Sequence, residues 1–134
     1  MSYSMDNIRN VCLLGHGGNG KTSLAESMLY LTGATDRLGK VADGNTVGDY
    51  DPEEIKRKIS ISLSTMYVEH QKHKINILDT PGYYDFVGEV NQALRVADSG
   101  IIVCAAKGGV SVGTEKAWKA LEDAKKPRFF YISK

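Results

Sequence analysis

The sequence contains little cysteine and no long apolar run. Cys12 and Cys104 are the only cysteines among 134 residues, and each lies inside a short apolar segment. Two thiols cannot build a disulfide scaffold, so we expect buried free cysteines in a reducing compartment, which favours the cytoplasm. The first ten residues, MSYSMDNIRN, lack the basic segment and apolar stretch of a signal peptide. We therefore expect neither an exported nor a membrane-inserted protein.

An excess of charge of one sign is also missing. The chain has 17 Lys and Arg against 16 Asp and Glu, a formal net charge of +1. This balance gives no global drive toward DNA or an anionic membrane, so we expect neither partner, and any contact with RNA must be local. The length is typical of a single domain, and we predict one domain over residues 1–134, as a monomer or a dimer formed in a crystal.

Strands and helices alternate along the chain. The hydrophobic pattern predicts strands at 8–14, 66–69, 74–79, 100–105 and 128–132, and helices at 21–31, 86–96 and 114–125. Such alternation predicts an α/β fold with a mostly parallel sheet, helices on both faces and one antiparallel edge strand, 66–69, which pairs with 74–79 in a hairpin. In such folds ligands bind beyond the carboxyl ends of the strands.

Two segments of the chain lack a regular pattern. Residues 33 to about 60 are polar and acidic, and we expect a loop with weak order there, which in a small domain is usually functional or mobile. The alternation of Ile59, Ile61 and Leu63 leads into the first strand of the hairpin. The chain stops at YISK, directly after a predicted strand that would need cover on both faces, so we expect a domain truncated after its fifth strand.

A glycine-rich motif gives the first chemical signal. Residues 15–22, GHGGNGKT, fit the pattern G-x-x-x-x-G-K-[ST] and lie between a predicted strand and a predicted helix. The glycines allow consecutive backbone N–H groups to face phosphate oxygens, and the positive end of the helix points at them. Lys21 adds a charge and Thr22 a hydroxyl ligand for Mg²⁺. A turn that merely caps a helix needs neither residue, so we predict a phosphate site.

A second motif, Asp79-Thr80-Pro81-Gly82, ends the strand at 74–79. The carboxylate of Asp79 could reach a metal ion through water, and the N–H of Gly82 could bind a γ-phosphate. By itself this sequence would be an ordinary turn. At the tip of a neighbouring strand, it predicts that two phosphate-binding motifs converge.

With both motifs identified, the sequence resembles the translational GTPases, and the elongation factor G-like proteins in particular. The resemblance covers nearly the whole chain and is carried by IRNVCLLGHGGNGKTSLAESMLYLTG, ILDTPGYYDFVGEVNQALRVADSGIIVCAAKGGV and EKAWKALEDAKKPRFFYISK. It implies a three-layer P-loop NTPase fold of the Ras-like GTPase type. It also implies GTP or GDP and Mg²⁺ as ligands, and GTP hydrolysis stimulated by the ribosome in a full-length protein.

The resemblance also implies a role for each matching residue. The implied nucleotide-binding residues are His16, Gly17, Gly18, Asn19, Gly20, Lys21, Thr22, Ser23, Asp79, Gly82, Ser133 and Lys134. The implied metal ligands are Thr22, Ser60 and Asp79, and the implied catalytic residues are Lys21 and Tyr83. His16 is expected to hydrogen-bond the loop rather than to take part in chemistry.

The first switch of the family carries an Arg-Gly-Ile-Thr motif, which residues 57–60 match as Arg-Lys-Ile-Ser. Ser60 keeps a hydroxyl for the metal ion. Lys58 replaces the glycine and does not easily adopt positive φ, so we expect difficulty in closing the switch in the family's manner. The basic run at 56–58 fits either a solvated patch or a contact with ribosomal RNA.

Three further positions depart from the family. Gly18 stands where an aspartate is common, which removes a side-chain ligand but leaves backbone cradling intact. Tyr83 replaces the catalytic histidine; a phenol can hydrogen-bond water but is a poor proton acceptor. Losing a general acid or base typically costs about 10²- to 10⁴-fold in rate, which predicts slow turnover. Packing of Tyr83 beside Tyr84 and Phe86 is an equally open interpretation.

The third departure concerns recognition of the base. Ser133 and Lys134 occupy the first two positions of the Asn-Lys-x-Asp motif, and the chain ends before the aspartate. Each charge-assisted hydrogen bond contributes about 1.5–3 kcal/mol, so we expect these residues alone to discriminate guanine poorly.

Two other functions stay open. An ATPase of the MinD and ParA type carries a Lys-Gly-Gly-x-Gly-Lys-Thr loop, which residues 16–22 match except at His16. A module that binds nucleotide only to present a surface to the ribosome, without hydrolysis, is supported by Tyr83 and Lys58.

Overall fold

Five strands form one sheet in the computed structural model, which describes residues 3–134. The strands are β1 (Ile8–Leu14), β2 (Ser64–His70), β3 (His73–Asp79), β4 (Ser99–Ala105) and β5 (Arg128–Ser133), and their order in the sheet is β2-β3-β1-β4-β5. Neighbouring strands are parallel except β2, which pairs antiparallel with β3 at one edge. The predicted mostly parallel sheet with one antiparallel edge strand is therefore confirmed.

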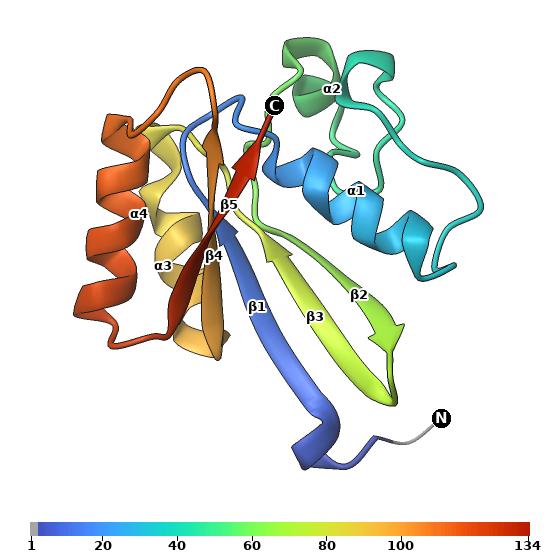
Figure 1. Ribbon diagram of the computed structural model, residues 1–134. Coiled ribbons are helices and arrows are strands. Elements are labelled where there is room, and N and C mark those ends of the chain that lie inside the picture. Colours follow the sequence, from blue (N-terminus) through green and yellow to red (C-terminus); the bar gives the residue numbers. More distant parts are fainter. Residues whose placement is uncertain (1–2) are drawn as a thin grey trace.

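Helices cover both faces of this sheet, as the sequence predicted (Figure 1). One face carries α1 (Lys21–Leu31), and the other carries α3 (Val87–Val96) and α4 (Val112–Asp123). Because successive side chains of a strand point to opposite faces, Leu13 packs in the core under α1, whereas Leu14 packs in the core under α3 and α4. The two cores make three layers, and no helix within residues 3–134 is both long and apolar enough to cross a membrane.

The central strand, β1, lies between β3 and β4. Its Cys12 is fully buried and pairs in register with Leu78 on one side and Gly100 on the other. Burial raises the pKa of the Cys12 thiol to about 11 because the thiolate would lose its hydration. Cys104 is also buried and free, so both cysteines are buried thiols, as expected from the sequence.

Residues 33–63 are more ordered than the sequence analysis predicted. They contain a 3-10 turn, Val41–Asp43, and a short helix, α2 (Pro52–Arg57). The helix begins with a capping box, in which the Asp51 carboxylate accepts from Glu53 N at 2.8 Å and the Glu54 carboxylate accepts from Asp51 N at 3.2 Å. Pro52 occupies the first helical position, where its missing N–H costs nothing. The expectation of a structureless loop was wrong because this helix is too short to show a hydrophobic period.

The hairpin is as predicted, and its first strand begins two residues before the predicted bounds of 66–69. β2 begins at Ser64, so residues 59–63 are not part of it. At the turn, His70 pairs with His73, while Gln71 and Lys72 adopt φ values of 47° and 65°. Two consecutive positive φ angles are typical of the tight turns that match the twist of a hairpin.

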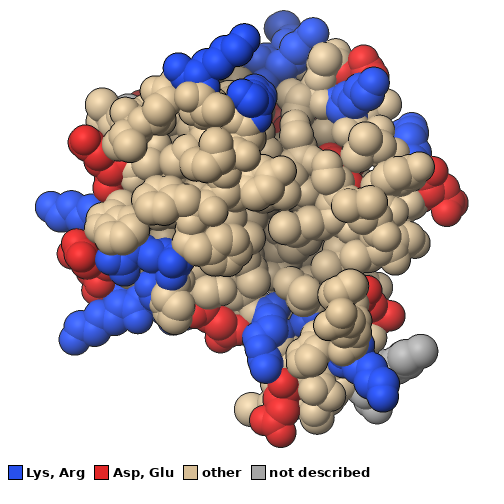
Figure 2. Space-filling view, in the orientation of Figure 1, with Lys and Arg blue, Asp and Glu red and all other residues tan. Residues whose placement is uncertain are grey.

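The far edge of the sheet, β5, exposes apolar side chains. Phe129, Phe130, Tyr131 and Ile132 are each 42–62% exposed. Figure 2 shows that charges of both signs surround an uncharged middle on this side of the molecule.

Trp118 lies on α4, and its spacing from Ala117 and Leu121 on a helix face predicts that it is a core residue. This prediction is wrong. Trp118 is 39% exposed, its ring stacks on Phe130 at 5.6 Å, and the Arg128 guanidinium lies 3.9 Å from the ring centroid.

A pair of glycine substitutions tests this packing. A Cβ at Gly100 in β4 would lie 2.5 Å from Cδ2 of Leu121, a fully buried side chain of α4. We expect Gly100→Ala to destabilise the protein by about 1–3 kcal/mol, because the core would be overpacked. Gly88→Ala in α3 meets no atom within 4 Å and should instead stabilise by about 0.5 kcal/mol. Urea unfolding of both variants checks the opposite signs; equal effects would contradict the packing of α4 on β4.

Candidate functional site

The glycine-rich turn joins the end of β1 to the start of α1. Gly15, Gly18 and Gly20 adopt φ values of 134°, 82° and 92°, conformations that other residues rarely adopt. The turn wraps around the Lys21 ammonium, which donates to Gly15 O at 3.0 Å and to His16 O at 3.1 Å. An ammonium has three protons, so one is left for a ligand. Burial lowers the pKa of Lys21, and the nearby carboxylates of Asp79 and Asp49 oppose that shift.

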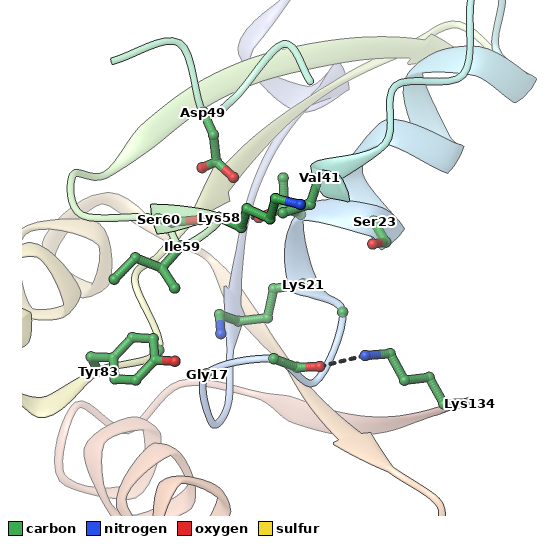
Figure 3. Close-up of a pocket in the computed structure, with 14 residues that line it drawn as sticks. Gly17, Lys21, Ser23, Val41, Asp49, Lys58, Ile59, Ser60, Tyr83 and Lys134 are labelled. Carbon is green, nitrogen blue, oxygen red and sulfur yellow. Dashed lines mark hydrogen bonds between the residues drawn. The ribbon is translucent and has the colours of Figure 1, made fainter. Parts of the chain in front are cut away.

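A cavity of about 150 Å³ lies over this turn (Figure 3). Most of the residues that line the cavity are ones that the sequence analysis named: Gly17, Gly18, Gly20, Lys21, Thr22, Ser23, Lys58, Ser60, Gly82, Tyr83 and Lys134. Val41, Asp49 and Ile59 complete the lining. The structure thus brings the glycine-rich turn, the Asp-Thr-Pro-Gly motif and part of the segment 33–63 to one hollow beyond the carboxyl ends of β1 and β3.

The two motifs approach each other closely enough to exclude a side chain. A Cβ at Gly82 would lie 2.5 Å from both Gly17 N and Lys21 Nζ. Thr80, which precedes it, is fully buried, and its hydroxyl donates to Leu13 O at 2.6 Å. This contact ties the end of β3 to β1, and the backbone of Gly82 lies directly against the lysine ammonium at the edge of the cavity.

Thr22 and Ser60 line the cavity, whereas the predicted site residue Asp79 does not line it and lies behind Thr22. The Thr22 hydroxyl donates to Asp79 Oδ2 at 2.7 Å, and it lies 3.1 Å from the Ser60 hydroxyl. Asp79 is 1% exposed and its Oδ1 atom has no hydrogen-bond partner. Burial raises the pKa of Asp79 to about 7, although the Thr22 hydrogen bond and the Lys21 charge oppose the shift. An unpaired buried carboxylate oxygen beside two hydroxyls fits a hard divalent cation.

The protein supplies few metal ligands of its own at this corner. Among the described residues, no group of three His, Cys, Asp or Glu side chains is placed to hold a metal ion. A cation bound by Thr22 and Ser60 would therefore take its remaining ligands from water and from an anionic ligand in the cavity. Mg²⁺ is typically held in this way, by one or two protein groups together with phosphates.

Asp49 is a site residue that the sequence reasoning missed. It is 5% exposed, lines the cavity, and its side chain hydrogen-bonds that of Ser60. Its Oδ1 atom lacks a partner, and burial raises its pKa. In the sequence Asp49 is one of several acidic residues in an irregular segment, so nothing there distinguished it from solvated neighbours.

Three carboxylates hold the segment 33–63 over the cavity. Glu26 of α1 accepts from Val47 N at 2.6 Å. Glu54 is 2% exposed and accepts from the N–H groups of residues 61 and 62 at 2.9 and 3.1 Å. Glu89 of α3 accepts from Leu63 N at 2.6 Å. Ionised acceptors make strong hydrogen bonds, so these contacts fix the segment at its middle and at its end.

Lys58 adopts a positive φ angle, which its residue type did not predict. It ends α2 with φ 55° and ψ 38°, in the left-handed region, and its N–H donates to Glu54 O. The missing glycine therefore does not prevent this backbone turn, although a side chain in that conformation costs roughly 1–2 kcal/mol. The capping interaction within α2 compensates for part of that cost.

Four predicted binding residues support the turn from outside the cavity or from its rim. Asn19 Nδ2 donates to Val103 O at 3.1 Å, away from the hollow. Ser133 Oγ donates to Asn19 O at 2.6 Å, and Lys134 Nζ donates to Gly18 O at 2.6 Å (Figure 3). His16 contributes its carbonyl oxygen to Lys21 and packs against Gly113 of α4. The end of β5 thus clamps the glycine-rich turn.

Tyr83 lies at the opposite side of the cavity. Its ring is against Gly17, and its hydroxyl points toward the region of Lys21 (Figure 3). The side chain is 43% exposed, so it is not a core residue. Of the two open interpretations, this placement favours a residue of the cavity wall over one that only packs on its neighbours.

The raised pKa of Asp79 predicts a pH-dependent effect of Asp79→Asn on the free protein. With a pKa of about 7 when folded, against about 4 when unfolded, the carboxyl costs stability progressively as pH rises between these values. We expect the asparagine variant to gain stability relative to the parent at pH 8, and to gain progressively less as the pH falls toward 4. Urea unfolding without Mg²⁺ or ligand checks this; a difference independent of pH would contradict it.

Comparisons with known proteins agree with this geometry. Residues 6–134 match the family model of the elongation factor Tu GTP binding domain. Elongation factor G 2 of Borreliella afzelii is 41% identical over 127 residues, which are 95% of this chain and 19% of that protein. The mitochondrial ribosome-releasing factor 2 of Scheffersomyces stipitis is 41% identical over 130 residues, 97% of this chain and 15% of that protein.

A solved structure from Thermus thermophilus superposes with a TM-score of 0.91 at 42% identity, covering 93% of this chain and 19% of that one. The chain therefore spans about a fifth or less of the length of these relatives. The match over residues 6–134, and the glycine-rich turn and Asp-Thr-Pro-Gly motif at one cavity, show that the chain belongs to the elongation factor Tu GTP binding domain family, among its elongation factor G-like members.

Proposed function

We propose that this chain binds GTP and GDP with Mg²⁺, and that a longer protein containing it hydrolyses GTP on the ribosome, slowly because of Tyr83. The observation that carries the proposal is the close approach of Gly82 to the Lys21 ammonium at one cavity, with the lining residue Thr22 hydrogen-bonded to Asp79 behind it. A polyphosphate placed there would meet a cation, backbone amides and a metal corner together.

The phosphate-binding role rests on the glycine-rich turn. Its backbone N–H groups, the remaining proton of Lys21 and the N–H of Gly82 are donors aimed at a small volume. α1 begins at Lys21, so its positive end adds to the field at the same point. Ser23, which also lines the cavity, would reach the phosphate nearest the nucleoside.

The metal role is assigned to Thr22, Ser60 and Asp79. Their mutual distances of 2.7 and 3.1 Å and the unpaired Asp79 Oδ1 fit a site for Mg²⁺, with Asp79 acting through water. When bound, the ion would neutralise charge on the β- and γ-phosphates. Asp49 adds a second buried carboxylate on the Ser60 side, which would strengthen attraction for a cation.

The nucleophile side of the site carries Tyr83 in place of a histidine. A phenol hydroxyl can orient a water molecule, but it cannot become a cation and accepts a proton poorly. The residues that position phosphates are therefore complete, while the residue nearest an attacking water is a weak one. This imbalance supports slow hydrolysis.

A phosphate site combined with a weak residue at position 83 also fits a second function. A nucleotide-dependent module that docks on the ribosome without hydrolysis would need the phosphate site but not a competent residue at position 83. The ribosome as partner is suggested by relatives named elongation factor and ribosome-releasing factor, some of them mitochondrial. We place the proposed activity in a compartment that contains translating ribosomes. The free thiols of Cys12 and Cys104 are typical of a reducing compartment, which favours the cytoplasm.

Competition for a fluorescent GDP analogue tests nucleotide choice in the longer protein. We expect GTP and GDP to displace the analogue and ATP to fail, because Ser133 and Lys134 match the first two positions of a motif that reads guanine. Lys21→Ala should abolish binding of GTP, GDP and the analogue by removing the ammonium at the phosphates, while its circular dichroism stays that of a folded protein. Equal displacement by ATP would contradict the proposed preference for guanine nucleotides.

Substitution at position 83 tests the catalytic proposal. Tyr83→His should raise the single-turnover rate of GTP hydrolysis on ribosomes by about 10²-fold or more, because an imidazole both accepts protons and can become cationic. Equal rates for the parent and the variant would show that Tyr83 does not limit hydrolysis. Phosphate release that ribosomes fail to stimulate in either protein would favour the module that does not hydrolyse.

A further inference from the structure

We propose that Gly17 is a positioning residue for Tyr83: the missing side chain at position 17 is what allows the phenol ring to lie on the glycine-rich turn with its hydroxyl in the cavity. The placement stands on geometry alone, whereas its effect on rate rests on the proposed GTP hydrolysis. The residue at position 17 thereby decides whether the Tyr83 hydroxyl faces the place of the attacking water.

The contact between the two residues is direct. A Cβ built on Gly17 would lie 2.7 Å from Cε2 of Tyr83, 2.8 Å from its Cζ and 3.2 Å from its Cδ2. Real Cβ atoms essentially never approach a ring carbon this closely, because repulsion rises steeply below van der Waals distance. Any side chain at position 17 would therefore move the ring, and the ring now occupies the space of that missing side chain.

Glycine is needed at positions 17 and 18 for different reasons. Gly18 has φ 82°, and a Cβ there would meet no atom within 4 Å, so its backbone conformation is what requires glycine. Gly17 is not among the glycines with positive φ. Its backbone would accept alanine, and the Tyr83 ring is the obstacle that the structure shows. The two neighbouring glycines therefore form a natural pair of test and control positions.

The backbone before Tyr83 is packed directly against the turn. Gly82 already lies against Gly17, where a Cβ would come within 2.5 Å of Gly17 N. The ring must therefore rotate away if position 17 gains a side chain. A second cavity of about 100 Å³ borders Tyr83 on its other side, lined in part by Val87 and Val90. This apolar space can receive part of a displaced ring, which would take the hydroxyl out of the nucleotide cavity.

A fluorine label tests the placement without any nucleotide. With 3-fluorotyrosine at position 83 of the full-length protein, we expect Gly17→Ala to move the ¹⁹F resonance toward that of free 3-fluorotyrosine. Gly18→Ala should leave the resonance in place, although it strains the turn. An unmoved resonance in Gly17→Ala, or an equal shift in Gly18→Ala, overturns the proposal. If Gly17→Ala fails to fold, Gly17→Ser gives the same comparison with a side chain that can hydrogen-bond.

Single-turnover hydrolysis on ribosomes tests the consequence. We expect Tyr83→Phe and Gly17→Ala, at saturating GTP, to lower the rate by a similar factor, on the order of tenfold for one lost hydrogen bond. The double variant should be no slower than either single one, because both changes remove the same hydroxyl from the cavity. Multiplicative losses would overturn the inference that Gly17 acts through Tyr83.

The two experiments separate this proposal from the proposed function. If the resonance moves as expected but Tyr83→Phe leaves the rate unchanged, the placement holds and the role of the hydroxyl in hydrolysis fails. If the protein binds no GTP, the fluorine result alone decides the placement of the ring.

Discussion

The structure around the cavity depends on the hydrogen bond from the Thr22 hydroxyl to the Asp79 carboxylate. This bond of 2.7 Å joins the first turn of α1 to the end of β3, two segments that approach only because β1 and β3 are parallel neighbours. Placing a carboxylate where it is 1% exposed is costly, since the charge loses its hydration. That cost is offset in part by Lys21 and Thr22, and a bound cation would offset more of it.

The same electrostatic logic extends to the segment over the cavity. Glu26, Glu54 and Glu89 come from three different helices, and each uses its carboxylate to hold backbone N–H groups between residues 47 and 63. Backbone groups in an irregular segment need such partners, because they have no ladder or helix to satisfy them. Two of these side chains, Glu26 and Glu89, lie outside residues 33–63, so the order of the segment depends in part on contacts that its own sequence does not show.

Local patterns predicted the elements on which the site is built. The helix expected at 21–31 and the strand expected at 8–14 have those bounds in the structure, because apolar spacing and flanking glycines mark both ends. α2 was missed, since its only signal is the capping box formed by Asp51 and Glu54. Trp118 was wrongly expected in the core; helical spacing shows which face a residue shares but not where that face leaves the core. Lys58 adopted a backbone conformation that its residue type disfavours.

By itself the sequence determined that a glycine-rich turn follows a buried strand, that Lys21 and Thr22 begin the next helix, and that a second phosphate motif ends a neighbouring strand. These features are local, because they depend on backbone propensity and on residues close in the chain. Only the tertiary structure decided that Asp49 lines the same cavity as Thr22 and Ser60, and that Tyr83 lies on Gly17. Both contacts join residues distant in sequence, and their positions follow from the packing of whole elements, which no local pattern encodes.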